Sequence, residues 1–157
     1  MSNPSSSPAE DETVAKILRL ARGWIGTPYC HQASCRGAGA DCLGLIRGVW
    51  REHFGGEPET PPAYTPDWGE ARGEDLLLGA ALRHMTYVTD PHPGDVLLFR
   101  MLERGPAKHL AVFSGICPIA GRRMIHAYSG HAVCETSLGA AWMRRLAGAF
   151  RFPRIPS

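Results

Sequence analysis

Cys42 is the residue of this sequence best suited to act as a nucleophile. It follows Asp41 and the small residues 37–40, and it opens a run whose apolar residues recur at helical spacing. A helix N-terminus lowers the pKa of a thiol, because its dipole and its free N–H groups stabilise the thiolate. We therefore expect Cys42 to be an activated thiolate. The alternative is a structural thiol, buried where the loop closes onto the helix.

A cysteine nucleophile also needs a base that takes up its proton and a group that orients this base. The chain contains seven histidines. Among them, His109 opens one apolar run typical of a strand, and His126 lies within the next. If these strands are antiparallel neighbours, both imidazoles lie on one face of the sheet near the same end. The sequence therefore predicts a site where Cys42, His109 and His126 meet.

The surrounding elements divide into helices followed by strands. The expected helices span 13–26, 42–54, 73–85 and, briefly, 139–148. The expected strands span 95–101, 109–116, 123–129, 131–137 and 149–153. The Pro- and Gly-dense stretch 55–70 is expected to be an ordered excursion over the surface. Helices first and an antiparallel meander afterwards indicate an α+β fold, with the N-terminal helices packed on a central antiparallel sheet.

Length and composition indicate one ordinary globular domain. The chain has 157 residues, of which 44% are hydrophobic and 20% charged, and its net charge is +2. We expect a flexible Ser/Pro segment over 1–12 and a single catalytic domain over 13–157. The weak basic bias argues against a nucleic-acid partner, and no apolar run is long enough to insert into a membrane. The first residues carry no signal-peptide pattern, so we expect synthesis in the cytoplasm.

The cysteines leave two further alternatives open. Four residues within a dozen positions have side chains that bind zinc: Cys30, His31, Cys35 and Cys42. No second pair with metal-site spacing completes them, so we expect neither a metal nor another cofactor. Cys30 and Cys35 can form a small disulfide only if the protein works outside the cytosol. The remaining cysteines are expected to be core thiols: Cys117 and Cys134.

Five short motifs occur in an order that resembles the NlpC-type cell-wall peptidases, which are papain-like cysteine hydrolases that cut peptidoglycan stem peptides. The motifs are GTPY (26–29), DCLGL (41–45), PGDVLLF (93–99), KHLAVF (108–113) and IHAYSG (125–130). The resemblance covers roughly 13–153. The segment 31–55, with PAYTPDW (62–68) after it, more closely resembles the branch encoded with phage and gene-transfer-agent tail genes.

The resemblance implies a role for each matching residue. Cys42 matches the family's nucleophile, His109 its general base and His126 the polar residue that orients the base. Tyr29 matches an aromatic residue whose hydroxyl lies near the nucleophile and helps to bind the oxyanion. Asp41 and Ser129 are two further candidate substrate-binding residues. The alternative for Asp41 is a helix cap, and the alternative for Ser129 is a structural role.

The function implied by the resemblance is hydrolysis of a stem-peptide bond, in the family usually that between D-γ-glutamate and a diamino acid. The tail-associated branch implies an enzyme carried by a phage-like particle and docked to tail-hub or tail-tip proteins. It would act in the periplasm of a target cell, for penetration of the cell wall. Two departures affect substrate details: Leu43 replaces a common Ser, and 30–40 replaces a Gly-rich, Trp-containing segment. The alternatives are a non-catalytic tail module and a related thiol hydrolase or acyltransferase.

Overall fold

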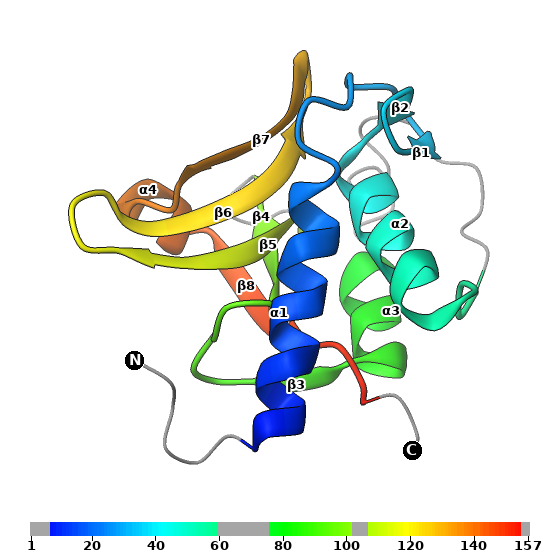
Figure 1. Ribbon diagram of the computed structural model, residues 1–157. Helices are drawn as coiled ribbons and strands as arrows, with labels where there is room; N and C mark the ends of the chain where they lie inside the picture. The colour runs from blue at the N-terminus through cyan, green and yellow to red at the C-terminus, as the bar shows by residue number, and fades with distance from the viewer. Residues whose placement is uncertain (1–6, 60–75, 102–106, 155–157) are drawn as a thin grey trace.

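The computed structural model describes residues 7–59, 76–101 and 107–154, and it consists of helices packed against an antiparallel sheet (Figure 1). Within these residues the sheet has six strands in the order β3-β8-β4-β5-β6-β7. The helices are α1 (Pro8–Arg22), α2 (Cys42–Phe54), α3 (Leu76–His84) and α4 (Ala140–Met143). The strands of this sheet are β3 (Thr86–Val88), β4 (Val96–Arg100), β5 (Ala107–Cys117), β6 (Gly121–Tyr128), β7 (His131–Ser137) and β8 (Leu146–Arg151). The predicted α+β class is confirmed.

The first helix begins at Pro8 and not at Thr13, so the expected flexible segment 1–12 is wrong for residues 8–12. Ser7 is the N-cap: its hydroxyl accepts a hydrogen bond from the backbone N–H of Glu10 at 3.2 Å. The Glu10 carboxylate in turn accepts one from the backbone N–H of Ser7 at 3.1 Å. This reciprocal capping box, with Pro8 at the first helical position, begins the helix five residues early.

The sheet is not the simple meander that was expected. Strands β4 to β7 are consecutive neighbours, but β8 returns to lie between β4 and β3. The helix expected over 139–148 is only the four residues of α4, because Leu146 already belongs to β8 and pairs with Phe99. Strand β3 was not predicted, since it is short and mostly exposed.

The segment between α1 and α2 contains a small hairpin, formed by β1 (Ser34–Cys35) and β2 (Gly39–Ala40). Of the excursion expected over 55–70, residues 60–70 lie outside the described residues, as do 73–75 of the expected third helix. In the described part of the chain, no helix is both long and apolar enough to cross a membrane.

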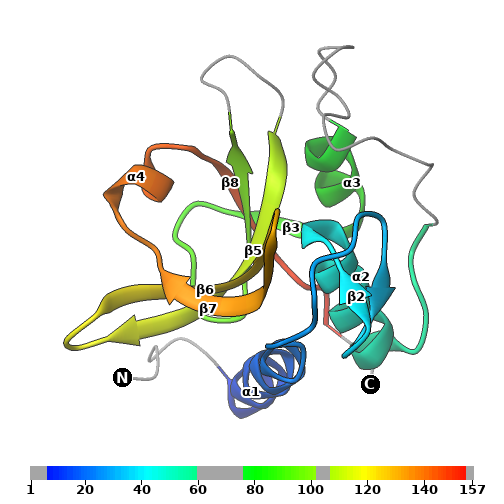
Figure 2. The same cartoon turned by 90° about the horizontal axis from the view of Figure 1, so that it is seen from above.

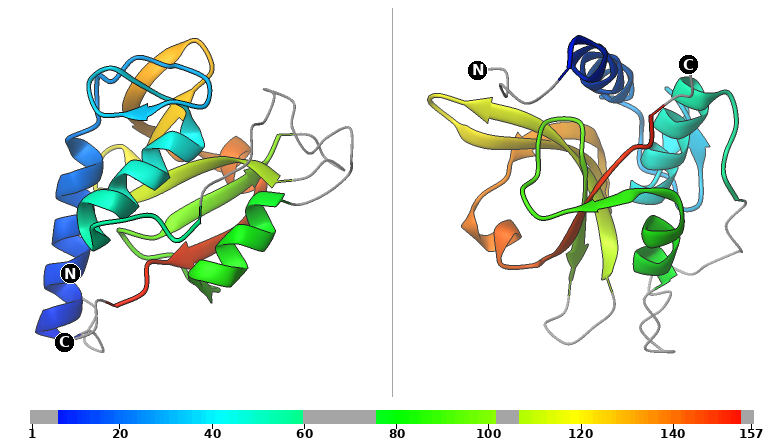
Figure 3. Two further views of the ribbon diagram at one scale, coloured as in Figure 1. Left: turned by 90° about the vertical axis from the view of Figure 1, so that its right-hand side faces the viewer. Right: turned by 90° about the horizontal axis from the view of Figure 1, so that it is seen from below.

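Side chains pack on both faces of the sheet. Figures 2 and 3 show α2 and α3 on one side of it and α4 on the other. The larger cluster joins the helices to the sheet and includes Trp24, Leu45 and Val112. The smaller cluster lies under α4 and includes Phe99 and Met124. Strand β5 contributes alternate residues to both clusters, so it carries one face of the core toward the helices and the other toward α4.

Candidate active site

The first turn of α2 is fixed by the buried carboxylate of Asp41. Its Oδ1 accepts a hydrogen bond from the backbone N–H of Gly44 at 2.7 Å, and its Oδ2 accepts one from the N–H of Gln32 at 2.7 Å. The hydroxyl of Ser34 donates to the carbonyl of Gly44 at 2.6 Å. Asp41 is therefore the N-cap of α2, and Cys42 is its first residue.

The thiol of Cys42 lies against the start of β5. Its Sγ donates a hydrogen bond to the carbonyl oxygen of Lys108 at 3.7 Å. The backbone of Leu110 also interacts with the sulfur. These two residues flank His109, so the nucleophile candidate meets β5 at the candidate base.

The two predicted histidines lie on adjacent strands, and a threonine of the next strand completes a row of three bonded side chains. Nε2 of His109 on β5 lies 2.9 Å from Nδ1 of His126 on β6, and Nε2 of His126 lies 2.9 Å from the hydroxyl of Thr136 on β7. If His109 acts as a base, Nδ1 is the nitrogen that accepts the proton, because Nε2 is engaged by His126. In this assignment each neutral imidazole carries its hydrogen on Nε2. His109 then donates to His126, and His126 donates to the hydroxyl of Thr136.

The resting site is a thiol beside a neutral imidazole. Burial, and then the carboxylate of Asp41, raise the pKa of Cys42 to about 12, against the opposing effect of backbone N–H groups. The activated thiolate expected from the helix N-terminus is therefore wrong, because burial and the adjacent carboxylate outweigh the helix. Burial, and then His126, lower the pKa of His109 to about 3. Burial lowers the pKa of His126 to about 4.

The remaining predicted residues lie beside the thiol. Burial raises the pKa of the Tyr29 hydroxyl, and Asp41 and Cys42 raise it further, so these three side chains are electrostatic neighbours. The side chain of Ser129 hydrogen-bonds that of Tyr29. Four predicted site residues, Tyr29, Asp41, Cys42 and Ser129, are thus neighbours. The other two, His109 and His126, form a bonded pair, and Cys42 meets β5 at the residue before His109.

Two site residues were missed from the sequence. Thr136 is the partner of His126, and the indole of Trp142 stacks on the imidazole of His109, with 5.2 Å between the ring centroids and 29° between the ring planes. Neither had a recognisable signal. Thr136 is diagonal to His126 only in the register of β6 with β7, and Trp142 reaches the site only through the placement of α4.

The cysteines outside the site are free thiols. Cys30 and Cys35 are exposed and lie at opposite edges of β2, where Cys30 N–H donates to Ala40 and Cys35 pairs with Gly39. The prediction that the other two cysteines are core thiols is wrong, because both are partly exposed: Cys117 and Cys134. Among the described residues no three His, Cys, Asp or Glu side chains are arranged to hold a metal ion.

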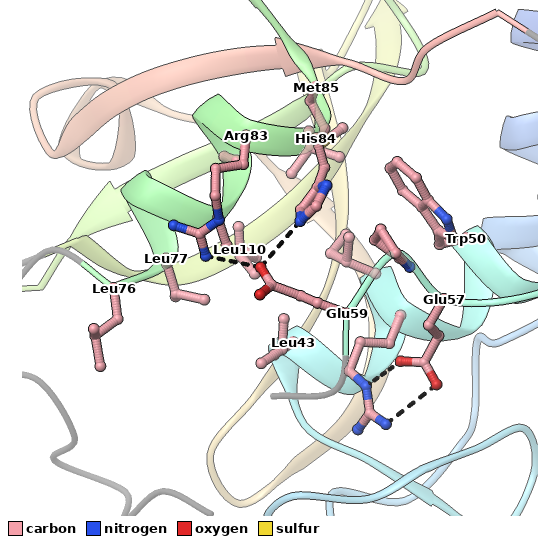
Figure 4. Close-up of a pocket in the computed structure, with 16 residues that line it drawn as sticks. Leu43, Trp50, Glu57, Glu59, Leu76, Leu77, Arg83, His84, Met85 and Leu110 are labelled. Carbon is pink, nitrogen blue, oxygen red and sulfur yellow. Dashed lines mark hydrogen bonds and ion pairs between the residues drawn. The ribbon is translucent and has the colours of Figure 1, made fainter. Parts of the chain in front are cut away.

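An apolar cavity of about 190 Å³ lies between α2 and α3 (Figure 4). It is lined by Leu43 and Leu110, the residues that follow the candidate nucleophile and base in the chain. Glu59 reaches across toward α3, where it binds Arg83 at 2.8 Å and His84 at 3.1 Å. The cavity therefore adjoins the site, and Leu43, which departs from the common Ser, lines it.

The buried histidines make the fold sensitive to acid. The unfolded chain takes up these protons near pH 6.5, whereas folded His109 and His126 stay neutral down to about pH 3–4. The contribution of these two histidines to the free energy of unfolding is thus fully present above about pH 6.5. It is lost as the pH falls, by up to about 1.4 kcal/mol per pH unit for each histidine. His53, buried without a hydrogen-bond partner among the described residues, has its pKa lowered by burial and by Lys16 and acts in the same direction.

Urea unfolding at pH 7.5, 6 and 5 measures this loss. The variant His126→Gln is expected to reduce the slope between pH 6 and pH 5, because one of the protonations disappears. Equal free energies of unfolding at pH 5 and pH 7.5 in the unsubstituted protein would contradict the neutral state of these imidazoles.

No protein-family model matches the chain, and no curated protein matches it significantly. Solved structures do match. A lipoprotein-like member of the NLP/P60 family from Staphylococcus aureus superposes with a TM-score of 0.61 at 21% identity, over 99% of this chain and 46% of that one. An NlpC/P60 family protein from Bacillus cereus gives 0.61 at 20% identity, over 88% of this chain and 40% of that one.

The NlpC/p60 domain of the peptidoglycan hydrolase SagA matches at nearly its full length. Its TM-score is 0.57 at 23% identity, over 88% of this chain and 98% of that domain. This chain spans less than half the length of the first two structures. The helices and the six-stranded antiparallel sheet of this protein therefore have the papain-like α+β fold of the NlpC/P60 structures.

Proposed function

We propose that this protein is a cysteine peptidase that hydrolyses peptide bonds in peptidoglycan stem peptides. The observation that carries the proposal is the chain of contacts from α2 to β7: Cys42 lies against β5 beside His109, and His109 is hydrogen-bonded to His126. A thiol, a base and a group that orients the base are the parts that nucleophilic acyl transfer requires. The description of SagA as a peptidoglycan hydrolase supports the substrate class.

The geometry assigns each side chain a step. Nδ1 of His109 takes the proton of Cys42 as the sulfur attacks the peptide carbonyl carbon, since both groups are neutral at rest. The N–H of Cys42 at the helix N-terminus and the hydroxyl of Tyr29 bind the oxyanion, a contribution of about 10²–10³ in rate for each donor. His109 then gives the proton to the leaving amine, and water releases the acyl group from the sulfur.

His126 and Thr136 orient the base. Nδ1 of neutral His126 accepts a hydrogen bond from Nε2–H of His109, and Nε2–H of His126 donates one to the hydroxyl of Thr136. When His109 becomes an imidazolium, this bond becomes charge-assisted and strengthens. Asp41 acts on the helix rather than on the proton, because both its oxygens are occupied by backbone N–H groups.

The finer assignment follows the motifs. The scissile bond is the one between D-γ-glutamate and the diamino acid, and the protein works in a phage-like or gene-transfer-agent tail, bound to tail-hub or tail-tip proteins. It is made in the cytoplasm and acts in the periplasm of the target cell. The support is the resemblance of 31–55 and 62–68 to the tail-associated branch.

The test is digestion of purified muropeptides, with the products identified by mass spectrometry. The protein is expected to release fragments cut within the stem peptide, and Cys42→Ala is expected to release none. Cys35→Ala is the matched control, because it removes an exposed thiol away from the site and should cleave normally. The fragment masses identify the bond.

Two other results would point to the rival functions. Selective alkylation of Cys42 by iodoacetamide without any cleavage would indicate a thiol enzyme with a different acyl substrate. No cleavage and an inert Cys42 would indicate a non-catalytic module, and either result would overturn the proposed peptidase.

A further inference from the structure

The imidazole of His109 is enclosed by aromatic rings and is only 5% exposed. Trp142 stacks on it, as described above. Tyr128 meets it edge-on at 5.7 Å and 83°, and Phe99 lies at 6.0 Å and 35°. His126 is nearly perpendicular to it, at 5.1 Å and 75°. Of these neighbours, Trp142 alone comes from outside the sheet.

Backbone hydrogen bonds on either side of α4 hold Trp142 in this position. Helix α4 is bounded by two backbone anchors: Leu138 N–H donates to Arg122 before it, and Arg100 N–H donates to Arg145 after it. The indole also packs on Phe99, with the ring centroids 5.1 Å apart. Figure 2 shows α4 on the side of the sheet away from α2. Trp142 therefore covers the catalytic histidines from the side opposite the nucleophile helix.

We propose that Trp142 is a positioning residue that excludes water from His109, so that this imidazole remains a neutral general base in acidic surroundings. The inference rests on the proposed function and deepens it, since it extends the pH range in which the base works. It assigns Trp142 a role beyond its packing on the cluster that lies under α4.

Two effects of the indole oppose each other. Its π face would stabilise an imidazolium and raise the pKa of His109, whereas its bulk removes water and lowers that pKa. Burial is the largest cause of the low pKa of His109, and the stacked indole is one of the groups that bury it, so we expect the exclusion of water to prevail. The titratable groups packed against the ring of His109 are His126 and Tyr128 of β6. Strand β4 contributes Phe99 and α4 contributes Trp142, while Cys42 of α2 contacts the backbone carbonyl of Lys108, the residue before His109.

The test compares Trp142→Ala with Trp142→Phe by NMR titration of ¹⁵N-labelled histidine, using His109→Gln to assign the signals. In the unsubstituted protein and in Trp142→Phe, His109 is expected to stay neutral at pH 5.5. In Trp142→Ala its pKa should rise toward the ordinary value near 6.5, where about one molecule in ten is neutral at pH 5.5. The activity kcat/KM should then fall about 10-fold at pH 5.5 relative to pH 8, and Trp142→Phe should restore the profile.

The titration uses no substrate, so it separates the two ways of failing. If the protein cleaves muropeptides but His109 titrates alike in all three forms, the role of Trp142 is overturned and the peptidase stands. If nothing is cleaved but the pKa moves as expected, the shielding stands and the proposed reaction fails. Should circular dichroism show that Trp142→Ala is unfolded, Trp142→Gln, which keeps bulk but admits water, takes its place under the same criteria.

Discussion

Replacing His109 by alanine is expected to lower kcat/KM for stem-peptide hydrolysis at least about 1,000-fold, as far as Cys42→Ala does. The reason is the raised pKa of Cys42. At about 12, it leaves a thiolate in only about one molecule in 10⁵ at pH 7. A preformed thiolate could attack without help, but a neutral thiol cannot, so the proton must move to His109 as the sulfur–carbon bond forms.

The double variant is the sharper measurement. Since Cys42 and His109 act as one unit, removing both should cost no more than removing either one. His92→Ala is the matched control, because His92 lies in a surface turn beside Asp90, and its activity should be unchanged. Losses that multiply in the double variant, or substantial activity in His109→Ala, would contradict proton transfer through this histidine.

Local signals explain which parts of the site could be predicted. Asp41 before an apolar helical run indicates a cap, and a cap fixes Cys42 at the first turn regardless of the rest of the fold. His109 and His126 each open or interrupt an apolar strand, which packing alone does not favour. Alternation along two adjacent strands then places both rings on one face, as the 2.9 Å contact between them shows.

Long-range packing explains what could not be predicted. The pKa of Cys42 depends on what covers it, and no local pattern reports the burial that outweighs the helix N-terminus. The position of β8 between β3 and β4 requires knowledge of strand order, and the same strand shortens the expected helix over 139–148. Trp142 becomes part of the site only as a result of that arrangement.

One local signal was present and was outweighed by composition. Ser7, Pro8 and Glu10 have the residue types and spacing of a capping box with proline at the first helical position. The Ser- and Pro-rich residues around them favoured a flexible segment. The structure shows that two hydrogen bonds between Ser7 and Glu10, with proline at the first helical position, outweigh the average composition of a dozen residues.

A second large effect is expected from Gly48→Ala, in the middle of α2. A Cβ at Gly48 would lie 1.9 Å from Cζ2 of the Trp24 indole. The ring has little freedom to withdraw, because it is 1% exposed and its Nε1–H donates to Glu52 at 2.8 Å. Overpacking of this severity costs about 3 kcal/mol, and alanine returns about 1 kcal/mol of helix propensity. The free energy of unfolding should thus fall by about 2 kcal/mol and the Tm by about 4–8 °C.

Two variants test the cause of this loss. Gly79→Ala makes the same change in α3, where a Cβ would meet only the flexible end of Arg83 at 3.3 Å, so stability should be kept or slightly raised. In a Trp24→Phe background the indole atom that a Cβ would contact is gone, so Gly48→Ala should cost much less than in the unsubstituted protein. An equal cost in both backgrounds would show that the glycine is required by the backbone of α2. A smaller cost would show that Trp24 and Gly48 together set how closely the chain after α1 approaches the helix that carries Cys42.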